Sequence, residues 1–186
     1  MKWFSSDWHL GHGNVIKFSD RPFASVQEMN TTILKNMYAP LKKGDILYYL
    51  GDLSWSKSAY ERAFDELPEG VEFVWILGNH DKKQWKQFKH LATSVADFKE
   101  INISGTLVTL CHYPMLTWNK SHYNSWMLFG HHHNKSHGTH EIEQRTMGKM
   151  LNVNCEFNDY KPYSEMDLAR IMAEKPNNWD YIEDKR

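Results

Sequence analysis

The stretch EFVWILGNHD, residues 72–81, joins an apolar run to a glycine and then to three polar side chains. Its first six residues are rich in aromatic and β-branched side chains, and a run of this length predicts a strand buried on both faces. Gly78 follows, and its lack of a side chain permits close approach of another backbone or a ligand. The polar residues Asn79, His80 and Asp81 therefore come directly after a buried strand.

Four other apolar runs end in the same manner. Each closes with a small residue and is followed by side chains that can bind a metal ion or transfer a proton. The runs occupy residues 2–6, 45–51, 106–111 and 125–130, and the side chains that follow them are Asp7, His9, Asp52, His112, His131 and His133. Ligands of open α/β sheets gather at the carboxyl ends of strands. We therefore expect all five segments to bring their polar residues to one place.

Spacing within these segments selects particular side chains. Side chains two residues apart on an extended segment point the same way. Asp7 and His9 are therefore expected to face one site, and so are His131 and His133. His132 is expected to point away.

The pooled positions form a set of oxygen and nitrogen donors without a thiolate: Asp7, His9, Asp52, Asn79, His112, His131 and His133. Seven donors are too many for one four-coordinate zinc ion, and they suit two divalent ions that share a bridging carboxylate. A mixture of carboxylate, amide and imidazole groups favours manganese first, with iron, zinc or nickel as alternatives. Calcium and magnesium prefer shells made of oxygen alone.

The rest of the chain predicts a single domain over residues 1–186. Helices are expected at residues 25–41, 56–67, 81–91 and 164–175, the first and last from capping-type starts at Ser25 and Ser164. Further strands are expected at residues 101–104 and 150–154. Alternating strands and helices in the first half favour an α/β fold, whereas residues 95–153 predict a second, more antiparallel sheet. Both halves fit a two-sheet β-sandwich flanked by helices.

Composition argues against several classes of protein. A formal net charge of −1 gives no reason to expect a long nucleic-acid groove. Two cysteines, Cys111 and Cys155, do not make a disulfide framework or a thiolate zinc site. Polar residues interrupt every apolar run before it could span a bilayer. We expect a cytoplasmic protein with no membrane partner and a small molecule as its ligand.

The order and rough spacing of five motifs resemble those of the calcineurin-like metallophosphoesterases, and in particular the small bacterial and phage members. The motifs are DWHLGH, LGD, GNHD, CHYP and GHHH, and they extend from Asp7 to His133. The resemblance implies a four-layer αββα arrangement of two sheets and flanking helices. It also implies a dinuclear phosphoesterase that hydrolyses phosphomonoesters or phosphodiesters.

The resemblance further implies a role for each motif residue. One metal ion would be held by Asp7, His9, Asp52 and His133. The other would be held by Asp52, Asn79, His112 and His131, so that Asp52 bridges the two. A hydroxide between the ions would attack phosphorus in line, while His80 protonates the leaving oxygen and Asp81 orients His80.

Three residues near the first motif are candidate substrate contacts: His12, Asn14 and Arg21. His12 is either a substrate contact, a support for a ligand or a loop residue. The guanidinium of Arg21 suits phosphate oxygens, but a residue before a proline equally marks a turn.

Four aromatic residues lie beside the motifs: Trp8, Trp55, Tyr113 and Trp118. They either line the mouth of the site, where they could stack a nucleobase, or pack in the core.

The substrate class stays open. Asp52 is followed by LSWS, which lacks the Val-Asp-Arg-Gly continuation associated with protein serine/threonine phosphatases. A nucleotide or a small phosphodiester is therefore favoured. The alternatives are a non-catalytic, metal-stabilised binding module and a nuclease acting on single-stranded ends.

Overall fold

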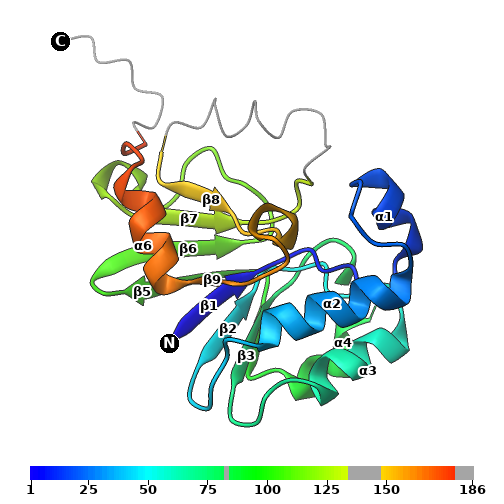
Figure 1. Ribbon diagram of the computed structural model, residues 1–186. Coiled ribbons are helices and arrows are strands. Elements are labelled where there is room, and N and C mark those ends of the chain that lie inside the picture. Colours follow the sequence, from blue (N-terminus) through cyan, green and yellow to red (C-terminus); the bar gives the residue numbers. More distant parts are fainter. Residues whose placement is uncertain (82–83, 134–147, 179–186) are drawn as a thin grey trace, which may run out of the picture.

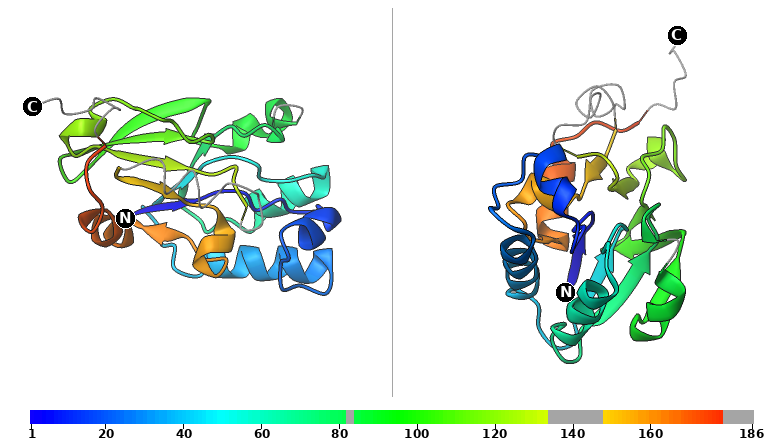
Figure 2. Two further views of the ribbon diagram at one scale, coloured as in Figure 1. Left: turned by 90° about the horizontal axis from the view of Figure 1, so that it is seen from above. Right: turned by 90° about the vertical axis from the view of Figure 1, so that its right-hand side faces the viewer.

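The computed structural model describes residues 1–81, 84–133 and 148–178. Two mixed β-sheets pack face to face and helices flank them (Figure 1), so the predicted two-sheet α/β sandwich is confirmed. Helices α2, α3 and α4 lie on the outer side of the first sheet, whereas α6 packs beside β1 and β9 (Figures 1 and 2).

The first sheet has the strand order β4-β3-β2-β1-β9. Its central strands β1 (Lys2–Ser5), β2 (Ile46–Tyr49) and β3 (Glu72–Ile76) are parallel, and β4 (Ser94–Ala96) continues in the same direction. The short β9 (Tyr163–Ser164) closes the edge antiparallel to β1. The apolar runs that predicted buried strands thus form the centre of this sheet.

The second sheet has the order β5-β6-β7-β8, and it is less antiparallel than the sequence predicts. β5 (Phe98–Ile103) and β6 (Thr106–Cys111) form an antiparallel hairpin, but β7 (Trp126–Phe129) and β8 (Met150–Asn152) each pair in parallel with the strand before them. The reason is the connection after β6. Residues 112–125 are long enough to carry the chain back to the start of the sheet, which a tight hairpin does not do.

Helices α2 and α6 begin at the predicted caps Ser25 and Ser164, and α3 begins at a cap that was not predicted, Ser56. The Ser25 hydroxyl accepts a hydrogen bond from the Glu28 amide at the start of α2 (Val26–Tyr38), and Ser56 caps α3 (Lys57–Asp65) in the same way. Ser164 and Asp167 form a capping box at α6 (Glu165–Ala173).

Two helical segments differ from the prediction. In the described part of residues 81–91, the helix is limited to α4 (Trp85–Phe88), followed by a 3-10 turn η2 (Lys89–Leu91). The short α1 (Gly13–Phe18) was not predicted, because it buries only Val15 and so shows no apolar periodicity. Two further 3-10 turns are η3 (Ser121–Tyr123) and η4 (Cys155–Asn158).

Two apolar clusters surround the first sheet. One cluster lies between this sheet and the helices α2 and α3, and includes Trp8, Ile33 and Trp75. The other lies between the two sheets and includes Phe4, Ile76 and Leu128. Within the described ranges, no helix has the length and apolar character needed to cross a bilayer.

The two sheets join at the carboxyl ends of their strands. The Ser6 amide donates to the Val153 carbonyl at 3.1 Å, and the Cys155 amide donates to the Ser6 carbonyl at 3.1 Å. The end of β1 is thereby held next to the end of β8. The strand ends of both sheets therefore border one region, as the strand-end motifs predict.

Candidate metal centre

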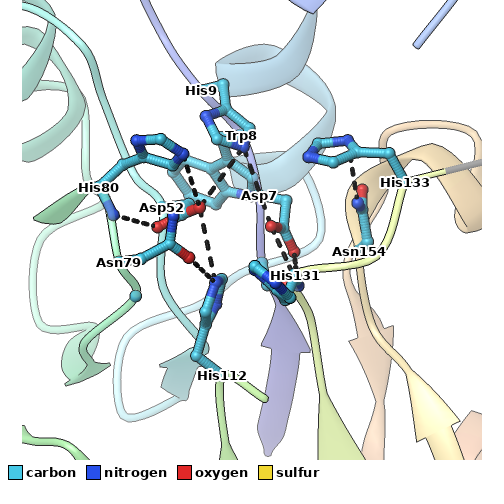
Figure 3. A network of polar contacts seen from close by, with 12 residues as sticks. Asp7, Trp8, His9, Asp52, Asn79, His80, His112, His131, His133 and Asn154 are labelled. Atoms are coloured by element: carbon cyan, nitrogen blue, oxygen red, sulfur yellow. Dashed lines mark hydrogen bonds and ion pairs between the residues drawn. The ribbon is translucent and has the colours of Figure 1, made fainter. Parts of the chain in front are cut away.

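The predicted ligands converge at this junction (Figure 3). Within the described chain, two groups place their ligand atoms within 4.8 Å of one another: Asp7, His9 and His133, and Asp52, His112 and His131. Asn79 lies against the second group, with its Oδ1 3.1 Å from His112 Nε2. This division matches the one that the motif resemblance implies. The structure thus brings all seven predicted ligands to one place.

Asp52 lies between the two groups. Its Oδ2 is 3.7 Å from His9 Nε2 on one side and 3.5 Å from His112 Nε2 on the other. Its other oxygen, Oδ1, accepts a hydrogen bond from the His80 amide at 2.9 Å. Because Oδ1 is occupied in this way, Oδ2 faces the nitrogen atoms of both groups. An oxygen in this position is within reach of a cation held by either group.

The ligand residues converge through an unusual backbone. Asp7, His9, Asp52 and His131 all have positive φ angles, between 50° and 70°. Side chains other than glycine seldom adopt this left-handed conformation, and the strain it carries is concentrated at functional sites. The prediction that Asp7 and His9 face one site is correct in outcome, but its premise of an extended segment is wrong. Tight turns after the strands aim these side chains.

Glycine permits the close approach of neighbouring turns. A Cβ atom added at Gly78 would lie 2.2 Å from Asp52 Oδ1, and one added at Gly130 would lie 2.4 Å from Asp7 Oδ2. Both distances are far below contact, so any side chain would displace a carboxylate. The small residues after the strands therefore serve the close approach that the sequence predicts.

The unpartnered atoms of the site fit a cation. His9 Nε2 is buried and has no hydrogen-bond partner, although buried polar atoms almost always have one. His112 Nδ1 lies 2.7 Å from the Leu50 carbonyl and donates to it, which directs Nε2 toward Asp52. Imidazole nitrogens and carboxylate oxygens directed at one space are the donors that a transition-metal ion prefers.

Electrostatics support the same conclusion. Burial raises the pKa of Asp7 to about 6. Burial also opposes ionisation of Asp52, but the hydrogen bond and charge of His112 outweigh it and lower the pKa of Asp52 to about 2. For His112, burial is outweighed by the facing carboxylates, which raise its pKa to about 9. In the metal-free protein, a proton on His112 thus balances charge that a divalent cation would neutralise.

A buried ion pair supports His133 from behind. Glu156 Oε1 lies 2.8 Å from His133 Nδ1 and accepts a hydrogen bond from Arg21 Nε, also at 2.8 Å. Arg21 in turn donates to the carbonyl oxygens of Trp8 at 2.8 Å and Asp7 at 2.7 Å. The pair therefore connects the turn after β1 to the loop that carries His133. It also directs His133 Nε2 away from Glu156, toward the site.

Arg21 is thus corrected as a candidate phosphate contact. Its side chain is completely buried, and its guanidinium donates to Glu156 and to two backbone carbonyls. A group engaged in this way cannot reach a ligand at the surface. Asn14 is exposed in the first turn of α1, and His12 lies half-buried with its ring stacked on Trp55.

Asp81 does not orient His80 as the resemblance implies. Its buried carboxylate accepts five hydrogen bonds, from the amides of Asp52, Leu53 and Gly78, the Tyr60 hydroxyl and the Trp75 indole. These donors use both oxygens, and three of them are amides of the turns after β2 and β3, whereas Tyr60 of α3 and Trp75 of β3 supply the other two. Asp81 therefore holds the turn that carries Asp52.

His80 lies at the rim of the site. Its side chain is 39% exposed, and its Nε2 is 3.9 Å from Asp52 Oδ2. His132 belongs to neither group of ligands, and its carbonyl accepts hydrogen bonds from Asn152 and Asn154. Its absence from both groups agrees with the prediction, although His131 has a left-handed φ of 70° instead of the extended conformation on which the prediction rests.

Asn154 and Glu156 also support the site, although the sequence patterns did not single them out. Asn154 Nδ2 lies 3.4 Å from His133 Nδ1, beside the contact of Glu156 with the same ring. Both residues come shortly after β8 (Met150–Asn152), but the predicted run at residues 150–154 ends in Asn154 itself and has no small residue at its end, so the rule used for the other five strands did not select them. The contacts of Tyr60 and Trp75 with Asp81 left no sequence signal, because a helix and a strand interior supply them.

The Glu156–His133 contact leads to a prediction about one group only. Replacing Glu156 by glutamine removes the carboxylate behind His133, and loss of such a partner weakens metal binding about 10- to 100-fold. Isothermal titration of the metal-free protein with Mn²⁺ should show the Asp7–His9–His133 group weakened and the second group retained. The Glu61→Gln variant, altered on the exposed face of α3, is the control. Unchanged affinity at both groups would rule out this role for Glu156.

The five contacts of Asp81 predict a cost in stability. In the Asp81→Asn variant an NH₂ group faces backbone donors, so the free energy of unfolding should fall by about 3 kcal/mol. Tyr60→Phe removes one donor and should cost about 1.5 kcal/mol. Urea denaturation of the metal-free variants measures both. An Asp81→Asn protein as stable as the parent would show that these hydrogen bonds do not hold the turn.

Comparison with known proteins agrees with this geometry. The family model described as calcineurin-like phosphoesterase matches residues 3–182. An uncharacterised protein of Methanocaldococcus jannaschii is 37% identical over 172 residues, which cover 91% of this chain and 89% of that protein. A crystal structure of a protein of unknown function from Aquifex aeolicus superposes with a TM-score of 0.74 at 30% identity, covering 92% of this chain and 98% of the other. The chain therefore belongs to the calcineurin-like phosphoesterase family.

Proposed function

We propose that the protein hydrolyses a phosphomonoester or phosphodiester at a dinuclear metal centre formed by the two ligand groups. The observation that supports this most strongly is the position of Asp52 Oδ2 between His9 and His112. Family membership supports the general activity of a phosphoric ester hydrolase. Manganese is the proposed metal because the donor set mixes carboxylates, an amide and imidazoles.

Two divalent cations held there would supply a water of lowered pKa as the nucleophile and would neutralise charge on the phosphoryl oxygens. The residues of the chain have separate tasks. Asp52 holds the two halves of the site together, and the buried His9 and His112 complete each half. Asn79 places an amide oxygen at the edge of the second group.

His80 is proposed as the general acid. Its backbone is fixed by the hydrogen bond from its amide to Asp52 Oδ1, whereas its ring is exposed at the rim. A proton on Nε2 would be transferred to the oxygen of the departing alcohol. The exposed position suits this role, because the leaving group must enter and depart from the solvent side.

The substrate is proposed to be small, of the nucleotide or simple diester type. The near-neutral chain offers no overall attraction for a long polyanion. The cytoplasmic location stays a prediction from the sequence.

The mechanism predicts different consequences for two substitutions. His80→Ala should lower kcat about 100- to 10,000-fold, because it removes the proton donor, while the metal content stays the same. Asp52→Asn should lower both activity and metal content, because it weakens both groups. Steady-state rates on bis(4-nitrophenyl) phosphate with Mn²⁺, together with elemental analysis, measure these effects. His90→Ala, at an exposed histidine of η2, is the matched control.

Two results would contradict the proposal. If His80→Ala kept full activity with two ions bound, His80 would not be the acid. If the folded, metal-loaded parent turned over no phosphate ester in a broad panel, the binding-module alternative would be correct.

A further inference from the structure

A small cavity of about 210 Å³ lies beside the metal centre, on the side of His80. Ser54, Trp55, Asn79, His80 and Gln84 line it. Asn79 is a predicted ligand and His80 the proposed acid, so the cavity opens directly onto the reacting centre. Its volume is below that of pockets for drug-sized ligands, and it suits one compact group.

Trp55 forms the apolar wall of this cavity. Trp55 is 47% exposed, so a large apolar ring faces water at this rim. Its ring lies 4.8 Å from the ring of His80, centroid to centroid. An exposed indole beside a proposed catalytic group is therefore placed to contact whatever is attached to the reacting oxygen.

The Trp55 ring is also held in place. The His12 ring stacks on it at 4.1 Å with an interplanar angle of 8°. The Trp55 amide donates to the Leu10 carbonyl at 2.8 Å, and the Ser54 hydroxyl donates to the same carbonyl at 2.9 Å. A ring fixed before the ligand arrives loses little conformational entropy on binding. These contacts also account for His12, which the sequence left open between support and substrate contact.

The other aromatic residues near the motifs do not compete for this role. Trp8 and Trp118 are buried in apolar clusters. Tyr113 is 39% exposed, but its ring lies against His112 and His131. Of the four aromatic candidates, Trp55 is the one that lines this cavity together with the proposed acid.

The direction of the reaction assigns a role to the cavity. In an in-line displacement, the nucleophile and the leaving oxygen lie on opposite sides of phosphorus, and the general acid contacts the leaving oxygen. The group attached to that oxygen must then lie next to His80, where the cavity is. This step rests on the proposed function, because it takes His80 as the acid.

We propose that this cavity is a leaving-group subsite for an alcohol that carries a planar aromatic ring, as the nucleoside of a nucleotide ester does. The ring packs on Trp55 between the walls formed by His80 and Gln84. A planar ring gains the most contact from an indole wall, since every aromatic base has a face that can stack. Hydrolysis breaks the bond between phosphorus and the nucleoside oxygen, water supplies the new oxygen on phosphorus, and the proton from His80 goes to the nucleoside.

A matched substrate pair isolates the contribution of the ring. Nucleoside 5′-monophosphates and ribose 5-phosphate have the same leaving oxygen and differ in the base, and the methyl diesters of both provide a second pair. The metal-loaded parent should show a kcat/KM about tenfold or more higher for the base-bearing member, mainly through KM. Trp55→Leu should abolish this ratio, Trp55→Phe should keep part of it, and Tyr123→Leu, at an exposed aromatic of η3, should leave it unchanged.

Aryl esters distinguish the source of the ring. The kcat/KM of phenyl phosphate is compared with that of an alkyl phosphate in the parent and in Trp55→Leu. If Trp55 raises this ratio as much as it raises the ratio for the nucleotides, the subsite accepts any planar aromatic ring, and the proposed class of leaving group is confirmed. Equal rates on both members of the ribose pairs, or a preference that persists in Trp55→Leu, would overturn the subsite while leaving the proposed function intact. Absence of turnover on every ester would instead overturn the proposed function.

Discussion

Two buried carboxylates, Asp7 and Asp52, face one small space where the strand ends of both sheets meet, and the arrangement of the site follows from this constraint. Like charges removed from water raise each other's pKa unless an opposite charge lies close by. In the metal-free protein, protonation of His112 supplies part of that charge, and its pKa rises accordingly. The ligand residues lie in strained left-handed turns, and the lack of a side chain at Gly78 and Gly130 leaves room for the two carboxylates. Cations would relieve the charge, so the site is organised around them.

Much of this centre could be predicted because the rule behind it is topological. Parallel strands place their carboxyl ends at one edge of their sheet, so the polar residues after β1, β2 and β3 converge. Those after β6 and β7 join them because the two sheets meet at their strand ends. What failed was the local geometry. The pairing of Asp7 with His9 was inferred from an extended segment, but both residues are left-handed. The second sheet was expected to be more antiparallel, because sequence patterns identify strands without showing where a 14-residue connection returns.

The partners of buried side chains were harder to predict than their convergence. Nothing in the sequence near Asp81 shows that Tyr60 and Trp75 will donate to it, and Arg21 beside Pro22 gave no sign of pairing with Glu156, 135 residues away. Such contacts depend on how helices and loops pack on the sheet. The buried partners hold the turns in place, whereas His80 and Trp55 are exposed at the rim of the site. Because a shared family fold does not fix the substrate, the proposed ligand contacts are assigned to this rim.

The central claim is that Asp52 bridges two cations, and crystals of the protein grown with Mn²⁺ test it most directly. Anomalous difference maps collected on either side of the manganese absorption edge locate each ion without reference to activity. The account predicts two peaks, one among Asp7, His9 and His133 and the other among Asn79, His112 and His131, with Asp52 Oδ2 between them. A single peak at full occupancy, or two peaks that Asp52 does not join, would contradict it.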